Sequence, residues 1–185
     1  MLQLKDLTYE HFLSGVLSAS ETLCRLQKDG IEVKNEPVQR ETFEQIDLLR
    51  RNIFIPIHNT FNQPIILTYG FAGLDLIRHI RKNASPSIAP RLDQHAGCEL
   101  KKDGTLICSR GGFAVDFFLQ GTNSLSVGQW IVSNCDFDRL YFYGEQRPIH
   151  VSVGPEKKRQ IVQVHTYDGL KKIPRTLSTE RFLEL

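Results

Sequence analysis

The sequence predicts a single α+β domain in which N-terminal helices pack on a mainly antiparallel sheet. Up to about residue 81, apolar side chains recur every three or four residues, as they do in helices that bury one face. From residue 98 onward, short apolar or alternating runs predominate, as they do in antiparallel strands. The 185 residues, 41% of them hydrophobic, suffice for one well-packed core and are too few for two large ones.

Two amphipathic segments predict helices near the N-terminus. The first covers residues 8–27 and the second residues 41–61, where Pro56 should kink or interrupt the helix because proline lacks a backbone N–H. A helix-turn-helix DNA reader is conceivable in this half of the chain. In the second segment only Arg50 and Arg51 supply positive charge, however, so the two segments are interpreted as packing helices.

The other elements alternate along the rest of the chain. We expect a strand at 65–67, a helix at 73–81, a proline-containing loop at 83–90, strands at 99–108 and 113–119, a helix at 126–134, and strands at 140–143, 150–153 and 159–166. The predicted domain spans residues 1–167. Residues 168–185 are predicted to be a C-terminal tail, either a docking arm for a partner or a frayed end.

Three residues lie in short motifs that suit a metal ion. His95 ends Asp-Gln-His, Asp116 closes Gly-Phe-Ala-Val-Asp, and His150 is the centre of Pro-Ile-His-Val-Ser. Two neutral imidazoles and one carboxylate leave a fourth tetrahedral position for water, which is the arrangement of a catalytic zinc ion. The sequence therefore predicts zinc at His95, Asp116 and His150, and it indicates hydrolysis.

These motifs belong to a wider resemblance from about residue 5 to about residue 165. The strand and turn at 65–72, the motif that ends at His95, and the strand around His150 are similar to the zinc D-Ala-D-Ala carboxypeptidase and hedgehog-like metallopeptidase superfamily. The small phage-lysin type of peptidoglycan peptidase is the most similar branch. The resemblance implies a carboxypeptidase-like fold, zinc bound by His95, Asp116 and His150, and cleavage of a peptide bond.

An additional segment, residues 98–108, separates His95 from Asp116. The corresponding ligands of the family are closer together in sequence. Its central Asp-Gly pair suits a tight turn, so the segment is interpreted as a β-hairpin whose adjacent ends keep the two ligands near each other. Glu99 and the lysines of the segment are expected to face outward. The hairpin would then be a lid or wall of the site, or a surface for a protein partner.

Two other positions depart from the family. Ala72 stands where the family has an arginine that grips a substrate carboxylate, and Phe142 stands where it has a general-base glutamate. Glu145 is the nearest carboxylate in sequence that can replace the base. Arg147 can bind an anionic group of the substrate, or it can be a surface arginine. Glu145 and Arg147 are therefore the candidate catalytic residues beside the zinc ligands.

Three classes of function remain open. The favoured class is a zinc-dependent hydrolase that acts on a peptide or amide bond of a peptide-like or acidic small substrate. The second is a zinc-binding recognition module whose catalysis has lapsed, as Ala72 and Phe142 permit. The third is a phage or defence factor that acts on nucleic acid or nucleotides, with Arg147 and the basic run 157–159 as phosphate contacts.

Composition and charge argue against several environments. The formal net charge of +2 gives no strong field for nucleic acid or an anionic membrane. No apolar run reaches the roughly 18 residues of a spanning helix, and the first residues do not resemble a signal peptide, so a cytoplasmic location is expected. The four cysteines form no Cys-x-x-Cys pair and are interpreted as buried or incidental thiols.

Overall fold

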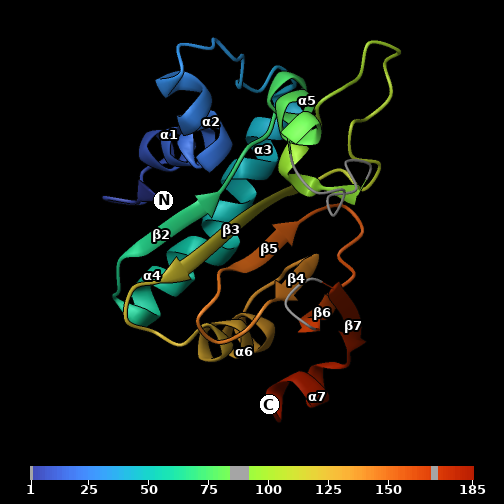
Figure 1. The fold of residues 1–185 in the computed structure, drawn as a ribbon. Helices are drawn as coiled ribbons and strands as arrows, with labels where there is room; N and C mark the ends of the chain where they lie inside the picture. The colour runs from blue at the N-terminus through green and yellow to red at the C-terminus, as the bar shows by residue number, and fades with distance from the viewer. Residues whose placement is uncertain (1, 84–91, 168–170) are drawn as a thin grey trace.

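The computed structural model describes residues 2–83, 92–167 and 171–185, and it is an α+β fold built on one seven-stranded mixed sheet (Figure 1). The strand order is β1-β2-β3-β5-β4-β6-β7, and neighbouring strands are antiparallel except for the parallel pair β4 and β6. The strands are β1 (Leu2–Gln3), β2 (Ile65–Tyr69), β3 (Phe113–Leu119), β4 (Arg139–Phe142), β5 (Ile149–Val153), β6 (Gln160–Tyr167) and β7 (Lys171–Leu177). The predicted α+β class is confirmed.

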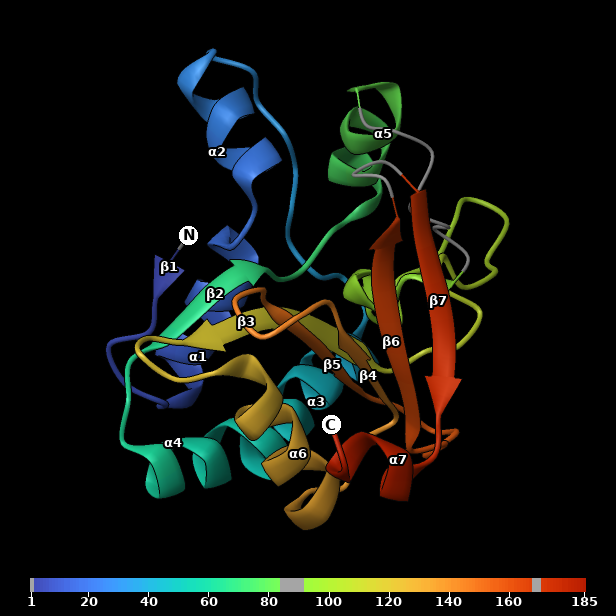
Figure 2. The ribbon, with the colours of Figure 1, turned by 60° about the horizontal axis from the view of Figure 1, so that its bottom comes forward.

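The helices pack around this sheet, and the longest helical run covers one of its faces (Figure 2). They are α1 (Tyr9–Ser18), α2 (Glu21–Lys28), α3 (Arg40–Leu49), the π-helical turn η1 (Arg50–Phe54), α4 (Ile55–Phe61), α5 (Leu74–Asn83), the 3-10 turn η3 (Gln94–Ala96), α6 (Ser124–Asn134) and α7 (Thr179–Leu183). In Figure 1, α3 and α4 lie behind β2 and β3. The opposite face of the central strands is therefore free of these helices.

Residues 8–27 form two helices instead of the single predicted one. Helix α1 ends before Ser20, and α2 begins after it. The Ser20 hydroxyl accepts a hydrogen bond from the Leu23 N–H and thereby caps α2. Ser20 also forms a β-bridge with Tyr69 at the end of β2, which ties the break to the sheet. A capping serine inside an apolar pattern starts a new helix that periodicity alone does not reveal.

The second predicted helix changes its geometry next to Pro56 but does not end there. Helix α3 continues directly into the π-helical turn η1 and then into α4, which has Pro56 in its first turn. Ile46, Leu49 and Phe54 from this run are fully buried, and the rings of Phe54 and Phe117 lie 4.9 Å apart. The helical run therefore packs directly on β3.

Side chains of the two central strands alternate between an apolar and a polar face. On β5, Val151 lies in the helix-packed core, whereas His150 and Ser152 point to the other face. On β3, Asp116 points to that same face because it lies directly opposite His150 in the antiparallel register. Every residue of β5 is buried, so its polar face is covered as well. The candidate site is thus built into a covered polar face of the sheet.

The prediction of a tail at 168–185 is wrong for residues 171–185, which belong to the domain. Strand β7 pairs antiparallel with β6, and α7 then packs against α6. Phe182 of α7 is fully buried against Gly128, with its ring 5.7 Å from the ring of Phe142. The core therefore extends to the last helix, and this part of the chain is neither a free arm nor a frayed end.

The segment 98–108 contains only a short form of the predicted β-hairpin. An antiparallel bridge pairs Leu100 with Leu106, and the N–H groups of Lys101 and Ile107 donate to the carbonyl oxygens of Thr105 and Glu99. Glu99 is buried rather than outward, because its carboxylate accepts hydrogen bonds from the N–H groups of Val38 and Gln39 and from the hydroxyl of Thr42. The segment is therefore anchored on the start of α3, where a carboxylate also suits the helix dipole.

The remaining predictions of local structure agree with the fold where it is described. The other strands and helices are found close to their expected bounds. The loop predicted at 83–90 lies, from residue 84 onward, outside the described residues. Over the described part of the chain, no helix combines the length and the apolar character needed to cross a bilayer. The cysteines are free thiols.

Replacing Phe182 tests whether the C-terminal helix stabilises the domain. Truncation of a fully buried phenylalanine typically costs about 3–5 kcal/mol, so Phe182→Ala should lower the free energy of unfolding by roughly that amount. Leu183→Ala, at the neighbouring exposed position, should change it by less than about 0.5 kcal/mol. Denaturant unfolding measures both values. Equally small losses in the two variants would show that α7 contributes nothing to the core.

Candidate metal centre

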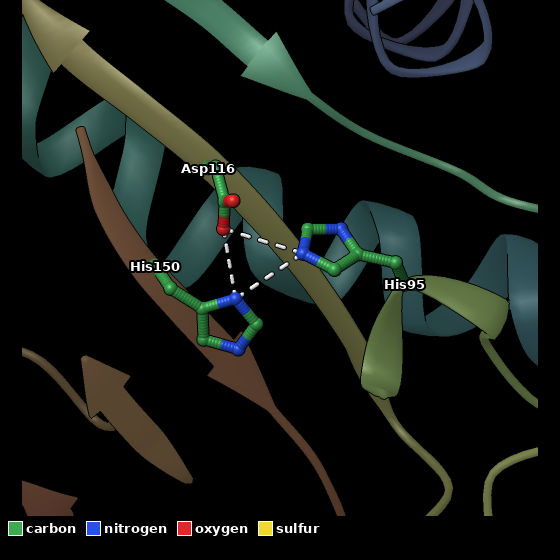
Figure 3. Close-up of side chains that lie close together, drawn as sticks. All are labelled: His95, Asp116 and His150. Carbon is green, nitrogen blue, oxygen red and sulfur yellow. Dashed lines mark hydrogen bonds and ion pairs between the residues drawn. The ribbon is translucent and has the colours of Figure 1, made fainter. Parts of the chain in front are cut away.

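His95, Asp116 and His150 meet on the polar face of the sheet (Figure 3). Asp116 comes from β3 and His150 from the neighbouring β5, while His95 comes from the turn η3. The His150 Nδ1 and Asp116 Oδ1 atoms lie 2.8 Å apart, and the His95 Nε2 atom lies 3.2 Å from each of them. The structure therefore brings together the three residues that the sequence selects as metal ligands.

The three atoms have nearly the spacing that a tetrahedral metal ion requires. Ligand atoms at bond lengths of about 2.0–2.1 Å lie about 3.3 Å from one another. The separations of 2.8 and 3.2 Å are close to this value. The side chains of His95 and His150 are 4% and 9% exposed, whereas that of Asp116 is 24% exposed. The group can therefore bind a metal ion that solvent reaches from the side of Asp116.

His95 is held in one orientation by its ring and by its backbone. Its Nδ1 atom lies 2.9 Å from the carbonyl oxygen of Gly70, which can only accept, so Nδ1 donates and Nε2 presents its lone pair to the group. The Asp93 carboxylate accepts from the His95 N–H, and the Ala72 N–H donates to the His95 carbonyl. Only glycine fits at position 70, because a Cβ there would lie 2.1 Å from the carbonyl oxygen of Val16. The turn after β2 therefore orients the first ligand.

Gln94, the neighbour of His95, is anchored in a buried polar network. Its side-chain N–H donates to Asp138, and its side-chain oxygen accepts from the Ser152 hydroxyl. Asp138 in turn pairs with the guanidinium of Arg139. The four residues of this network, Gln94, Asp138, Arg139 and Ser152, are at most 2% exposed. The network fixes the turn that carries His95, as outer partners commonly do for metal ligands.

Neighbouring groups of opposite charge shift the pKa values of His95 and Asp116. Burial lowers the pKa of His95, but the carboxylates of Asp116 and Asp93 outweigh burial, so this pKa is raised above its ordinary value. Burial raises the pKa of Asp116, but His95 and His150 outweigh it, so this pKa lies well below its usual range. A metal ion must therefore compete with a proton on an imidazole.

Three tyrosines lie around the candidate ligands. The ring of Tyr69 lies 4.2 Å from the ring of His95, and the ring of Tyr141 stacks on that of His150 at 4.8 Å. Burial, together with nearby carboxylates, raises the pKa of the Tyr69 and Tyr143 phenols well above the usual range. These two phenols therefore stay uncharged and can act as hydrogen-bond donors.

Glu145 and Arg147, the two candidate catalytic residues, make no contact with the candidate ligands among the described interactions. Their side chains are exposed on the turn between β4 and β5, where Glu145 accepts a hydrogen bond from Asn123 at the start of α6. Within the described ranges, no hydrogen bond or ion pair joins either side chain to a candidate ligand.

Other residues with predicted roles contact groups of the chain other than the candidate ligands. Phe142 packs on Phe182 in the apolar core, on the face of β4 opposite to the candidate ligands. In the run 157–159, Lys158 pairs with Glu156, and Arg159 donates to carbonyl oxygens at the end of α6. These two basic side chains therefore have partners within the chain.

Sequence patterns miss several residues that build the site. Asp138 and Arg139 hold Gln94 across a long separation in sequence, and Arg110 donates a hydrogen bond of 3.0 Å to the Tyr141 hydroxyl. The one available signal is alternation along β4, which puts Arg139 and Tyr141 on the same face of the sheet. No local motif marks Arg110.

The chain matches no protein-family model, no curated protein and no solved structure. The arrangement of its own side chains is therefore the basis for assigning a function. Within that arrangement, the three candidate ligands and the network behind Gln94 are the features with direct chemical meaning.

Gln94→Ala tests the positioning role of the buried network. The variant removes the anchor of the turn that carries His95, so metal affinity should fall about 10- to 100-fold while the protein stays folded. Gln129→Ala, which removes a half-buried glutamine bonded to the C-terminal helix, should leave the affinity unchanged. Titration calorimetry measures both. Unchanged affinity in Gln94→Ala would show that η3 holds His95 without this network.

The pKa shifts predict how the metal-free protein responds to pH. A raised His95 pKa stabilises the fold below about pH 6.5, the ordinary imidazole pKa, and this contribution is lost as pH rises through the folded value. A lowered Asp116 pKa stabilises the fold above about pH 4, and this contribution is lost as pH falls through the folded value. Both contributions are therefore present together between about pH 4 and pH 6.5.

Metal binding should become stronger as pH rises, because protons leave the imidazoles when a metal ion binds. The increase in melting temperature on adding zinc should therefore grow between about pH 5.5 and pH 8. Calorimetric melting with and without the metal measures this increase. An increase that does not change with pH would show that His95 and His150 are not the ligands.

Proposed function

We propose that the chain is a zinc-dependent hydrolase with a metallopeptidase-like site, and that it cleaves a peptide or amide bond of a non-standard substrate. The observation that carries the proposal is the triangle of His95 Nε2, Asp116 Oδ1 and His150 Nδ1, with separations of 2.8 and 3.2 Å. Three protein ligands leave one position open, as in catalytic zinc sites. The resemblance of the motifs to hedgehog-like and D-Ala-D-Ala carboxypeptidases supports the same assignment and a related fold.

The chain's own residues define how the metal would be held. His95 and His150 would bind zinc through nitrogen, and Asp116 through a carboxylate oxygen. When bound, zinc lowers the pKa of a coordinated water towards about 7 and polarises a carbonyl group. The same donor set, two imidazoles and one carboxylate, also suits non-haem iron(II), so the identity of the metal is part of the test.

Asp93 is the carboxylate best placed to move a proton. One of its oxygens accepts from the His95 N–H, and its charge raises the pKa of both His95 and Tyr69. We assign to the other oxygen the role of accepting a proton from the attacking water and delivering it to the leaving amine. Tyr69 and Tyr143, which stay uncharged, can donate to the substrate oxygen as it becomes negative.

A recognition module with lapsed catalysis is the main alternative. Ala72 is fully buried among apolar side chains, so the position that grips a substrate carboxylate in the family cannot contact a substrate here. This is the observation that favours the alternative. The hydrolase is preferred because Asp93 and the tyrosines supply proton transfer and charge stabilisation beside the ligands. A nucleic-acid function has less support, because Lys158 and Arg159 contact groups of the chain itself.

Metal analysis of ligand variants tests the proposal directly. Protein purified without chelator should contain about one zinc ion per chain. Because loss of an outer partner already costs about 10- to 100-fold in affinity, His95→Ala, Asp116→Ala and His150→Ala should each lose more than about 100-fold. His58→Ala, at an exposed position on α4, is the matched control and should bind as the parent does. Metal retained in all three ligand variants would contradict the site, and iron in place of zinc would contradict the hydrolase.

Turnover tests the assignment of the base. Release of free amine from a library of short peptides should depend on zinc and stop with chelation. Asp93→Asn should lower the rate about 100- to 10,000-fold while the metal stays bound. If Glu145→Gln abolishes turnover and Asp93→Asn does not, the base is Glu145. A zinc-loaded protein that cleaves no member of the library would favour the recognition module.

A further inference from the structure

Arg110 joins the two sides of the metal group. Its Nη1 atom donates to the carbonyl oxygen of Leu92 and to the hydroxyl of Tyr141, each at 3.0 Å. Leu92 lies just before the turn that carries His95. Tyr141 stacks on His150, with an angle of 20° between the rings. The guanidinium therefore lies between the segment that carries the first candidate ligand and the strand that supports the last.

Arg110 also has no acidic partner, which sets it apart from the other arginines removed from solvent. Among the described arginines, Arg50, Arg110 and Arg139 are buried or half-buried. Arg50 pairs with Asp47, and Arg139 pairs with Asp138 and Glu156. For Arg110, no carboxylate of the described residues forms an ion pair. A half-buried cation without a counter-ion is available for an anion from outside the chain.

Among the described residues, the two hydrogen bonds of Arg110 leave one edge of its guanidinium without a partner. A guanidinium carries five N–H donors in a fixed plane, and both bonds within the chain use the Nη1 atom. The Nε and Nη2 atoms remain, and their two parallel N–H groups match the two oxygens of a carboxylate. The bonds to Leu92 and Tyr141 hold the plane in place, so little ordering is needed when a ligand binds.

The charges around the metal group favour an anion at this position. A divalent metal would outweigh the single negative charge of Asp116, and Arg110 adds a further positive charge. Asp93 is the remaining carboxylate that acts on His95 and Tyr69. The loaded site would thus be net positive.

We propose that Arg110 is the specificity-determining residue of the site, and that its Nε–Nη2 edge binds a carboxylate of the substrate while the scissile carbonyl lies at the metal. The inference rests on the proposed function, because it places the carboxylate relative to the metal group. Arg110 then has the role of binding the substrate carboxylate, instead of Arg147, which is exposed on a turn, or Ala72, which is buried. The substrate is then an acidic peptide-like molecule.

Metal-binding probes with and without a carboxylate test this inference by a binding measurement. The probes are linear hydroxamates of graded chain length that end in a carboxylate, a neutral carboxamide or a phosphonate. Each is titrated calorimetrically into the full chain loaded with zinc. The visible spectrum of the cobalt-loaded protein reports whether the hydroxamate reaches the metal. At the best chain length, the carboxylate probe should bind about 10- to 100-fold more tightly than its carboxamide mate, as hydrogen bonds to charged groups usually contribute.

Variants of Arg110 and of a matched arginine show which residue causes the preference for the carboxylate probe. Arg110→Gln should abolish it, Arg110→Lys should keep only part of it because lysine lacks the planar fork, and Arg147→Gln should keep all of it. Circular dichroism and metal content show whether each variant remains folded and loaded. If Arg110→Gln is unfolded, Tyr141→Phe serves instead. It removes one bond that orients the guanidinium and should weaken the preference about 3- to 10-fold.

The outcomes separate failure of this inference from failure of the proposed function. Equal affinity for carboxylate and carboxamide probes, with the cobalt spectrum showing both at the metal, would overturn the role of Arg110 and leave the metal site intact. Loss of the preference in Arg147→Gln alone would transfer the role to Arg147. A stronger preference for the phosphonate would replace the carboxylate by a phosphate group. A protein that takes up no metal would contradict the proposed function, and the inference would fall with it.

Discussion

The antiparallel pairing of β3 with β5 is the constraint on which the site depends. It sets Asp116 opposite His150 on one face, and it sets Val115 opposite Val151 on the helix-packed face. If either strand slipped by one residue, its ligand would turn into the apolar core and its valine would turn to the polar side. The apolar packing with α3 and η1 opposes such a slip. Packing on one face therefore specifies the geometry of the metal group on the other.

The third ligand depends on polar contacts rather than on the sheet. His95 lies in a short turn that is held by Gly70 at its ring and by Asp138 through Gln94. A buried pair such as Asp138 and Arg139 adds little stability, because the cost of removing both charges from water offsets their attraction. The buried Arg139 Nε atom has no hydrogen-bond partner at all among the described groups. We therefore interpret the network as a device that fixes the geometry of the ligands, at some expense in stability.

Local patterns in the sequence predict most of the fold, and short motifs select all three candidate ligands. Prediction fails where distant partners decide the environment of a residue. The Asp-Gly turn within 98–108 is present, with Gly104 at a φ of 78°, and its flanks pair over one bridge, but Glu99 is buried instead of outward because its carboxylate binds the start of α3. Strand β7 lies at the edge of the sheet, where lysine and proline are tolerated, so with Pro174 it has the composition of a tail.

Arg110 and Arg147 show why proximity in sequence is a poor guide to a site on a sheet. Arg147 lies just before His150 but on an exposed turn, whereas Arg110 is distant in sequence and reaches the ring of Tyr141 that stacks on His150. Tyr141 and Arg110 are half-buried, so substituting either residue opens no cavity in the apolar core. Substrate preference can thus change on the polar face while the core keeps the register of the ligands.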